Sequence, residues 1–267
     1  GFAHHHHTCP PAILVIIHLA IFVHSPFSQV MNCNGKQSFF LRPFHHAVLQ
    51  GAFEQFRYNR NNINVHVAKI VGANDLYKKE RALGIAKVVC YDPRHNITLS
   101  QMKLEKVVTV FAAFQQQMVE FEKNPAIKSV LIFENKGEAV GVSNSHPHCQ
   151  IYATDFSFKL VEQQIKIADK HREVYSKNIF EEIIGNEKRD GLRVLAENEN
   201  AIAFIPFFAR YAYEVMIFPK KNHQSLMSLS RKELSDLTSV FHQVVRRMDM
   251  NFQMDFPYMM SIMQAPV

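Results

Sequence analysis

Three polar side chains recur at every second position near the middle of the chain: His146, His148 and Gln150. Pro147 lacks an N–H and favours an extended conformation for the residue before it, which indicates that a strand begins here. Residues two apart in a strand point to the same face, so two imidazoles and an amide should line one face. This set suits phosphate chemistry, because a neutral imidazole can attack phosphorus while an amide donates hydrogen bonds to its oxygens.

A glycine-punctuated loop precedes these side chains and should lie beside them. Gly137 and Gly141 allow the backbone to approach a ligand closely. The loop follows a run of β-branched and apolar residues over 128–133, which is typical of a strand. The sequence therefore predicts a strand, a loop and a second strand that together present the polar face.

The stretch from residue 135 to residue 151 reads N-K-G-x-x-x-G-x-S-N-x-H-P-H-x-Q-I. It resembles the signature of the galactose-1-phosphate uridylyltransferase family, which belongs to the histidine-triad superfamily. The resemblance begins near residue 74, strengthens from residue 86 and continues to residue 266. It implies an α+β, histidine-triad-like fold of two repeated halves, with a mostly antiparallel sheet and helices packed on it.

The resemblance also implies an activity, partners and a location. Members of the family move a uridylyl group from UDP-glucose to a hexose 1-phosphate, galactose 1-phosphate, through a covalent uridylyl-histidine. We therefore expect a UDP-sugar and a hexose 1-phosphate as substrates, a homodimer and a cytoplasmic protein. The alternatives are an ADP-sugar or dinucleoside-polyphosphate phosphorylase or adenylyltransferase of the same superfamily, and a non-catalytic remnant.

By the same resemblance, His148 is the nucleophile and Gln150 a hydrogen-bond donor to the phosphate. Single-domain triad hydrolases carry a histidine where Gln150 stands, and an amide cannot act as acid or base, which favours transfer over hydrolysis. Four further residues match the family's substrate contacts: Asn135, Gly141, Ser143 and Asn144. For Asn135 the alternative is that its side chain caps a turn at the end of the strand.

His95 and His146 match two zinc ligands of bacterial family members, whose other two ligands are cysteines at C-x-x-C spacing. Cys33 lies at about the family separation from His95, but Val30 occupies the position of the first cysteine. The expected zinc site is therefore incomplete, and a turn histidine bonded to backbone is the alternative for His95. A rival interpretation makes His95, His146 and His148 three ligands of a hydrolytic metal ion, but it gives no role to the amide or the glycine loop.

The family carries a second metal site, which we expect to be missing here. Met263 stands where the family has a histidine ligand, and Gln164 stands where it has a carboxylate ligand.

Composition narrows the class of protein. Of 267 residues, 47% are hydrophobic and 20% are charged, as in a globular chain. The net charge of +6 is spread along the sequence without a long basic block, so we expect no nucleic-acid partner. Four cysteines without a C-x-x-C pair favour a reducing compartment.

Residues 1–35 contain no Asp, Glu, Lys or Arg and include an apolar run over 12–23. That run is too short to span a membrane, so we expect no membrane association. It fits the apolar core of a signal peptide, a buried strand or helix, or an N-terminus foreign to the family. We divide the chain into this segment, a first half with the motif (36–180) and an incomplete second half (181–267).

An internal repeat supports the two halves. A strand at 87–91, a helix over 100–123 capped by Ser100 and a strand at 129–133 recur as a strand at 214–218, a helix over 230–249 capped by Ser230 and a strand at 258–262. The first copy continues into the His-Pro-His motif, whereas this sequence shows no such strand after 258–262. We therefore expect an unpaired strand edge and exposed apolar side chains near residues 258–263.

Overall fold

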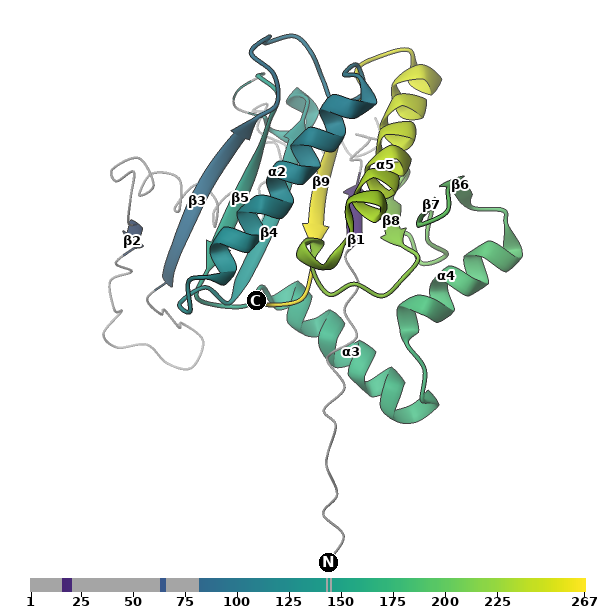
Figure 1. Cartoon of the computed structure of the whole chain (residues 1–267). Coiled ribbons are helices and arrows are strands. Elements are labelled where there is room, and N and C mark those ends of the chain that lie inside the picture. The colour runs from purple at the N-terminus through teal and green to yellow at the C-terminus, as the bar shows by residue number, and fades with distance from the viewer. Residues whose placement is uncertain (1–15, 21–62, 66–81, 143, 145) are drawn as a thin grey trace, which may run out of the picture.

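The computed structural model describes residues 16–20, 63–65, 82–142, 144 and 146–267. Four helices and nine strands in these ranges form the α+β fold that the sequence predicts (Figure 1). The helices are α2 (Leu104–Glu122), α3 (Lys159–Tyr175), α4 (Ile179–Asp190) and α5 (Arg231–Phe252), with short 3-10 turns η2 (Glu138–Val140) and η3 (Leu226–Ser228). The strands are β1 (Ile16–Ala20), β2 (Ile63–Val65), β3 (Ala82–Cys90), β4 (Ser129–Lys136), β5 (His148–Thr154), β6 (Val194–Glu197), β7 (Ala201–Phe204), β8 (Val215–Pro219) and β9 (Tyr258–Met263).

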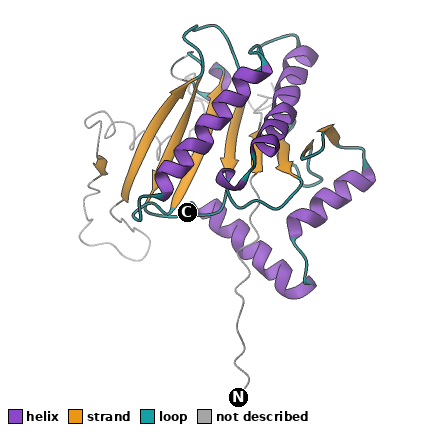
Figure 2. Ribbon diagram, in the orientation of Figure 1, coloured by secondary structure: helices purple, strands orange, loops and turns teal. Residues whose placement is uncertain are grey.

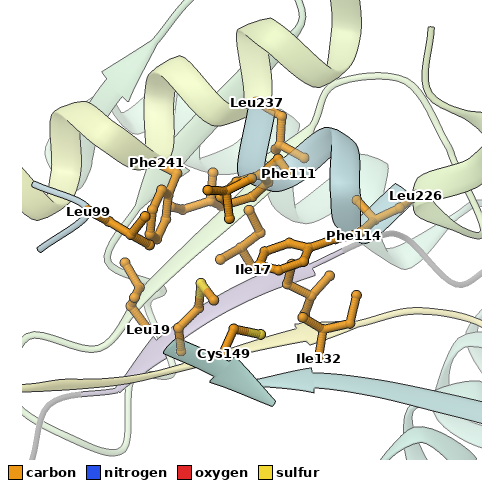
Figure 3. Packing of buried hydrophobic residues seen from close by; sticks show 14 of the residues in the cluster. Ile17, Leu19, Leu99, Phe111, Phe114, Ile132, Cys149, Leu226, Leu237 and Phe241 are labelled. Atoms are coloured by element: carbon orange, nitrogen blue, oxygen red, sulfur yellow. The ribbon is translucent and has the colours of Figure 1, made fainter. Parts of the chain in front are cut away.

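All nine strands belong to one antiparallel sheet, in the order β2-β3-β5-β4-β9-β1-β8-β7-β6. Helices α2 and α5 lie side by side across one face of this sheet (Figure 2). Their contact includes Phe111 and Phe241, whose rings lie 5.2 Å apart. The main apolar core fills the space between these helices and the sheet (Figure 3).

The opposite face of the sheet is covered by helices in one half and not equally in the other. Beneath β7, β8 and β9 it is covered by α3 and α4, through a second apolar cluster that includes Phe180, Phe204 and Phe218. On β3 the same face carries Val88, which is 60% exposed. Among the described residues, this face is therefore exposed at Val88 on β3 and half-buried along β5.

Helix α5 begins as the sequence predicts, whereas α2 does not. Ser230 and Glu233 form a reciprocal capping box, which satisfies backbone N–H groups at the start of α5. Ser100 does not cap α2, which starts at Leu104 after Lys103. The hydroxyl of Ser100 instead bonds the carboxylate of Asp249 on α5, a contact 149 residues away in sequence that local patterns do not show.

The predicted repeat is present, but its strand alignment is wrong. In both copies a strand, a long helix and a second strand follow one another: β3, α2, β4 and then β8, α5, β9. Val130 and Ile132 of β4 face the helices, as do Tyr258 and Met260 of β9. Since neighbouring residues of a strand face opposite sides, matching 129 with 258 pairs residues of opposite faces, so the alignment is shifted by an odd number of residues.

The prediction of an unpaired strand edge at residues 258–263 is wrong. Strand β9 pairs with β4 on one side and with β1 on the other. Tyr258, Met260 and Ile262 are buried. The sequence pattern did not reveal that residues 16–20 would supply the strand that covers this edge, because that pairing joins segments more than 200 residues apart.

Other expectations from the sequence can be compared with the structure. The polar composition of residues 185–191, with a glycine at each end, favours a linker, but this stretch lies mostly inside α4, where Gly185 is a helical residue. The uncharged segment over 1–35 contributes β1, so one of its alternatives, a buried strand, holds for residues 16–20. The division of the chain at residue 180 stays a prediction. None of the helices in the described ranges is long and apolar enough to cross a membrane.

Candidate active site

The His-Pro-His motif opens β5, as its sequence predicts. His148, Gln150 and Tyr152 are half-buried and point to the face away from α2 and α5. The residues between them, Cys149 and Ile151, are fully buried on the helix side. The alternation of β5 therefore divides the motif into a core face and a face available to a ligand.

His148 is held in a defined tautomer by its own backbone neighbour. Its Nδ1 lies 2.7 Å from the carbonyl oxygen of His146. A carbonyl oxygen can only accept, so Nδ1 carries the proton and donates it. The free lone pair of a neutral imidazole then lies on Nε2, and this lone pair is what a histidine needs in order to attack phosphorus.

Gln150 is oriented by a residue that sequence reasoning missed. The hydroxyl of Tyr152 donates to Oε1 of Gln150 over 3.1 Å. The ring of Phe133, which pairs with Gln150 across β4 and β5, packs edge-on against Tyr152 at 5.1 Å. The amide oxygen is thereby occupied and the NH₂ end of Gln150 points away from Tyr152. Extending the alternation His146, His148, Gln150 by one step would have identified Tyr152.

The loop between β4 and β5 contains the other predicted substrate contacts. Asn135 is half-buried near the end of β4, on the same face as Phe133. Gly141 has a φ of 78°, and its N–H donates to the carbonyl of Glu138. Asn144 accepts a hydrogen bond from the N–H of His146 at 3.0 Å, while Ser143 lies outside the described residues. Asn144 thus shapes the turn into the motif, and the substrate contacts stay predictions.

Gly137 explains the sharp exit from β4. Its φ of 96° is a conformation that residues with a side chain rarely adopt. A Cβ at this position would lie 2.8 Å from Cβ of Pro257. The loop therefore needs glycine here for both backbone conformation and space.

A buried polar layer lies on the helix side of β4, directly behind this loop. Glu134 accepts a hydrogen bond from the hydroxyl of Tyr258 at 2.9 Å. Burial raises the pKa of Glu134 to about 7, although the bond from Tyr258 and the charge of Lys136 act to lower it. Lys136 forms an ion pair with Asp249 of α5 at 3.1 Å. These contacts connect the end of β4 that leads into the loop with β9 and with α5.

His95 and His146 come together as the zinc prediction requires. Their Nδ1 atoms lie 2.8 Å apart, and one ring donates to the other. Two ligand atoms of one tetrahedral zinc, with bonds of about 2.0–2.1 Å, lie about 3.3 Å apart. The two rings therefore fit as neighbouring ligands after a small separation.

The rest of that metal site is not in the described part of the chain. There, no group of three or more His, Cys, Asp or Glu residues is placed to hold a metal ion. Cys33 lies outside the described residues. His95, His146 and His148 are therefore not placed as three ligands of one hydrolytic metal ion, although the bond from Nδ1 of His148 would by itself leave Nε2 free for a metal.

The positions that match the family's second metal site also lie together. Nε2 of Gln164 on α3 lies 3.5 Å from the sulfur of Met263 on β9. An amide and a thioether here make a contact between helix and sheet.

Comparisons with known proteins show the family to which the chain belongs. Residues 45–157 match the model of the galactose-1-phosphate uridyl transferase N-terminal domain, and residues 160–267 match that of its C-terminal domain. The chain belongs to the galactose-1-phosphate uridylyltransferase family. The predicted family and the predicted α+β fold are therefore confirmed.

Individual relatives support the membership. Galactose-1-phosphate uridylyltransferases of Saccharomyces cerevisiae and Thermotoga maritima are 33% and 34% identical to it, over 73% and 71% of this chain. A solved uridylyltransferase structure superposes with a TM-score of 0.69 at 27% identity, covering 78% of this chain and 67% of that one. The chain spans 54% and 59% of the length of the two curated relatives.

Proposed function

We propose that the protein transfers a uridylyl group from UDP-glucose to a hexose 1-phosphate, with galactose 1-phosphate as acceptor. The observation that carries this proposal is the hydrogen bond from Nδ1 of His148 to the carbonyl of His146, which leaves Nε2 as the basic nitrogen. Membership in the uridylyltransferase family supports the choice of nucleotide and sugar.

The reaction has two steps that share one covalent intermediate. In the first, Nε2 of His148 bonds to the α-phosphorus of UDP-glucose, the bond from that phosphorus to the bridging oxygen breaks, and glucose 1-phosphate leaves. In the second, a phosphate oxygen of the hexose 1-phosphate bonds to the same phosphorus, and the nitrogen–phosphorus bond breaks. The NH₂ end of Gln150 donates to the phosphoryl oxygens while charge develops on them.

The chemistry of Gln150 favours transfer over hydrolysis. A histidine at this position could pass a proton to or from water, whereas an amide cannot. Asn135, Gly141, Ser143 and Asn144 complete the proposal as substrate contacts of the loop.

Mass spectrometry of the intact chain tests the proposal. We expect a uridylyl adduct after incubation with UDP-glucose, no adduct in His148→Ala, and full labelling in the control His171→Ala. His171 lies on α3 and bonds Glu182, away from β5. An adenylyl adduct from ADP-glucose would establish the alternative nucleotide, and a folded wild-type chain that forms neither adduct would refute the proposal. Unchanged labelling of His148→Ala would remove His148 from its role.

We further propose that the protein is a cytoplasmic homodimer and that His95, His146 and Cys33 hold a zinc ion. The convergence of the two imidazoles supports the metal, and no step of the transfer passes through it. Elemental analysis should find zinc bound to the wild-type chain and lost from both His95→Ala and Cys33→Ala. Zinc retained in both variants would contradict this assignment.

A further inference from the structure

Strand β1 occupies, in the second repeat, the place that β5 occupies in the first. Ile151 of β5 lies between Lys87 of β3 and Ile132 of β4. In the same way, Leu19 of β1 lies between Val215 of β8 and Met260 of β9. Both strands run antiparallel to both neighbours. The two repeats are therefore matched in every strand of this three-strand unit.

The two central strands come from different places in the sequence. Strand β5 follows β4 in its own repeat, with only the loop over 137–147 between them. Strand β1 lies at residues 16–20, whereas its neighbours begin at residues 215 and 258. The second repeat is thus completed by a segment from outside the repeat.

The contacts of β1 are those of an interior strand. Five of its residues pair with β9 and three with β8. Ile17 and Leu19 are fully buried, and Figure 3 shows them among Phe111, Phe114 and Phe241. Both backbone edges of this segment are therefore paired with β8 and β9, and the side chains of Ile17 and Leu19 are buried in the core beneath the helices.

We propose that the space between β8 and β9 is a strand-binding site, and that its occupant is the apolar segment around residues 16–20 of the same chain. The site recognises an extended backbone through two antiparallel ladders and selects apolar residues at positions 17 and 19. Binding rests on these contacts and not on the covalent connection to β2. A second chain could offer the same segment, and the experiments distinguish that case.

Cleavage of the connection tests whether contacts alone hold the strand. A specific protease sequence is inserted after Asn34, and the cleaved protein is passed over a native size-exclusion column. We expect the N-terminal peptide to stay with the body of the wild-type protein and to be lost in Leu19→Asp, because burying an unpaired carboxylate opposes docking. Ser25→Asp, five residues beyond β1, is the matched control and should retain the peptide. A wild-type peptide that separates as readily as that of Leu19→Asp would overturn the proposal.

Cross-linking then tests the register and the origin of the strand in the uncleaved chain. The pair Leu19→Cys with Met260→Cys joins residues opposite each other, whereas Leu19→Cys with Ile262→Cys is out of register. We expect mild oxidation to give a disulfide within one chain in the first pair only, identified by peptide mapping. A disulfide between two chains would assign the site to a second copy, and equal yields in both pairs would refute the pairing itself. Neither experiment depends on catalytic activity.

Discussion

Replacing Tyr152 by phenylalanine removes its hydrogen bond to Gln150 at the candidate site. The substitution removes the hydroxyl that donates to Oε1 of Gln150 at 3.1 Å, and it keeps the ring that packs on Phe133. The NH₂ end of Gln150 should then lose its fixed direction. We expect slower transfer with little change in the stability of the fold.

The size of the effect follows from the type of bond. A neutral hydrogen bond contributes about 0.5–1.5 kcal/mol net, which corresponds to about a 2- to 12-fold slower reaction. Removing the amide itself in Gln150→Ala removes a preorganised donor and should slow transfer by about 10²–10³-fold. Tyr152→Phe should therefore fall well short of Gln150→Ala.

Single-turnover formation of the uridylyl adduct measures both effects. Because Tyr152 acts through Gln150, the Tyr152→Phe change should lower the rate at saturating UDP-glucose and leave half-saturation nearly unchanged. It should have no further effect in a Gln150→Ala background. An equal slowing in both backgrounds would show that Tyr152 acts independently of the amide and refute the reasoning.

Two other predictions concern stability. The pKa of Glu134 is about 7 in the folded protein against 4.5 ordinarily, so between these pH values the folded state holds a proton that the unfolded chain releases. The contribution of Glu134 to stability should be complete below about pH 4.5 and should be lost as the pH rises through about 7, by up to about 3 kcal/mol. Urea unfolding at pH 5 and pH 8 should show this loss in the wild type and not in Glu134→Gln, and an equal loss in both would exclude Glu134 as its source. Gly141→Ala should lower the stability of the fold by roughly 1 kcal/mol, and Gly137→Ala should lower it by more, because only Gly137→Ala places a Cβ against Pro257. Equal melting temperatures of the two variants would contradict this prediction.

Local patterns in the sequence were enough for the elements that carry the motif. Pro147 and the alternation after it predicted β5, and Ser230 predicted the start of α5. The face of β5 followed from the same alternation. Such features depend on neighbours within four residues, so they can be predicted without knowledge of the fold.

Contacts between distant segments could not be predicted in the same way. The pairing of residues 16–20 with β9 and the bond from Ser100 to Asp249 each join parts of the chain more than 100 residues apart. The role of Tyr152 depends on the side-chain conformation of Gln150, which the sequence does not specify. The error in the repeat alignment arose because apolar strands of similar composition align almost equally well in neighbouring registers.

The central position of β4 and β9 has a consequence for how the protein unfolds. These two strands pair from Ile132 with Ile262 to Lys136 with Tyr258, so the halves share one hydrogen-bonded ladder. Loss of β1 would expose an edge of β9, and loosening of β9 would in turn release β4 and the strand that bears His148. The two repeats should therefore melt as a single cooperative unit, in which destabilisation of the N-terminal strand also destabilises the strand that bears His148.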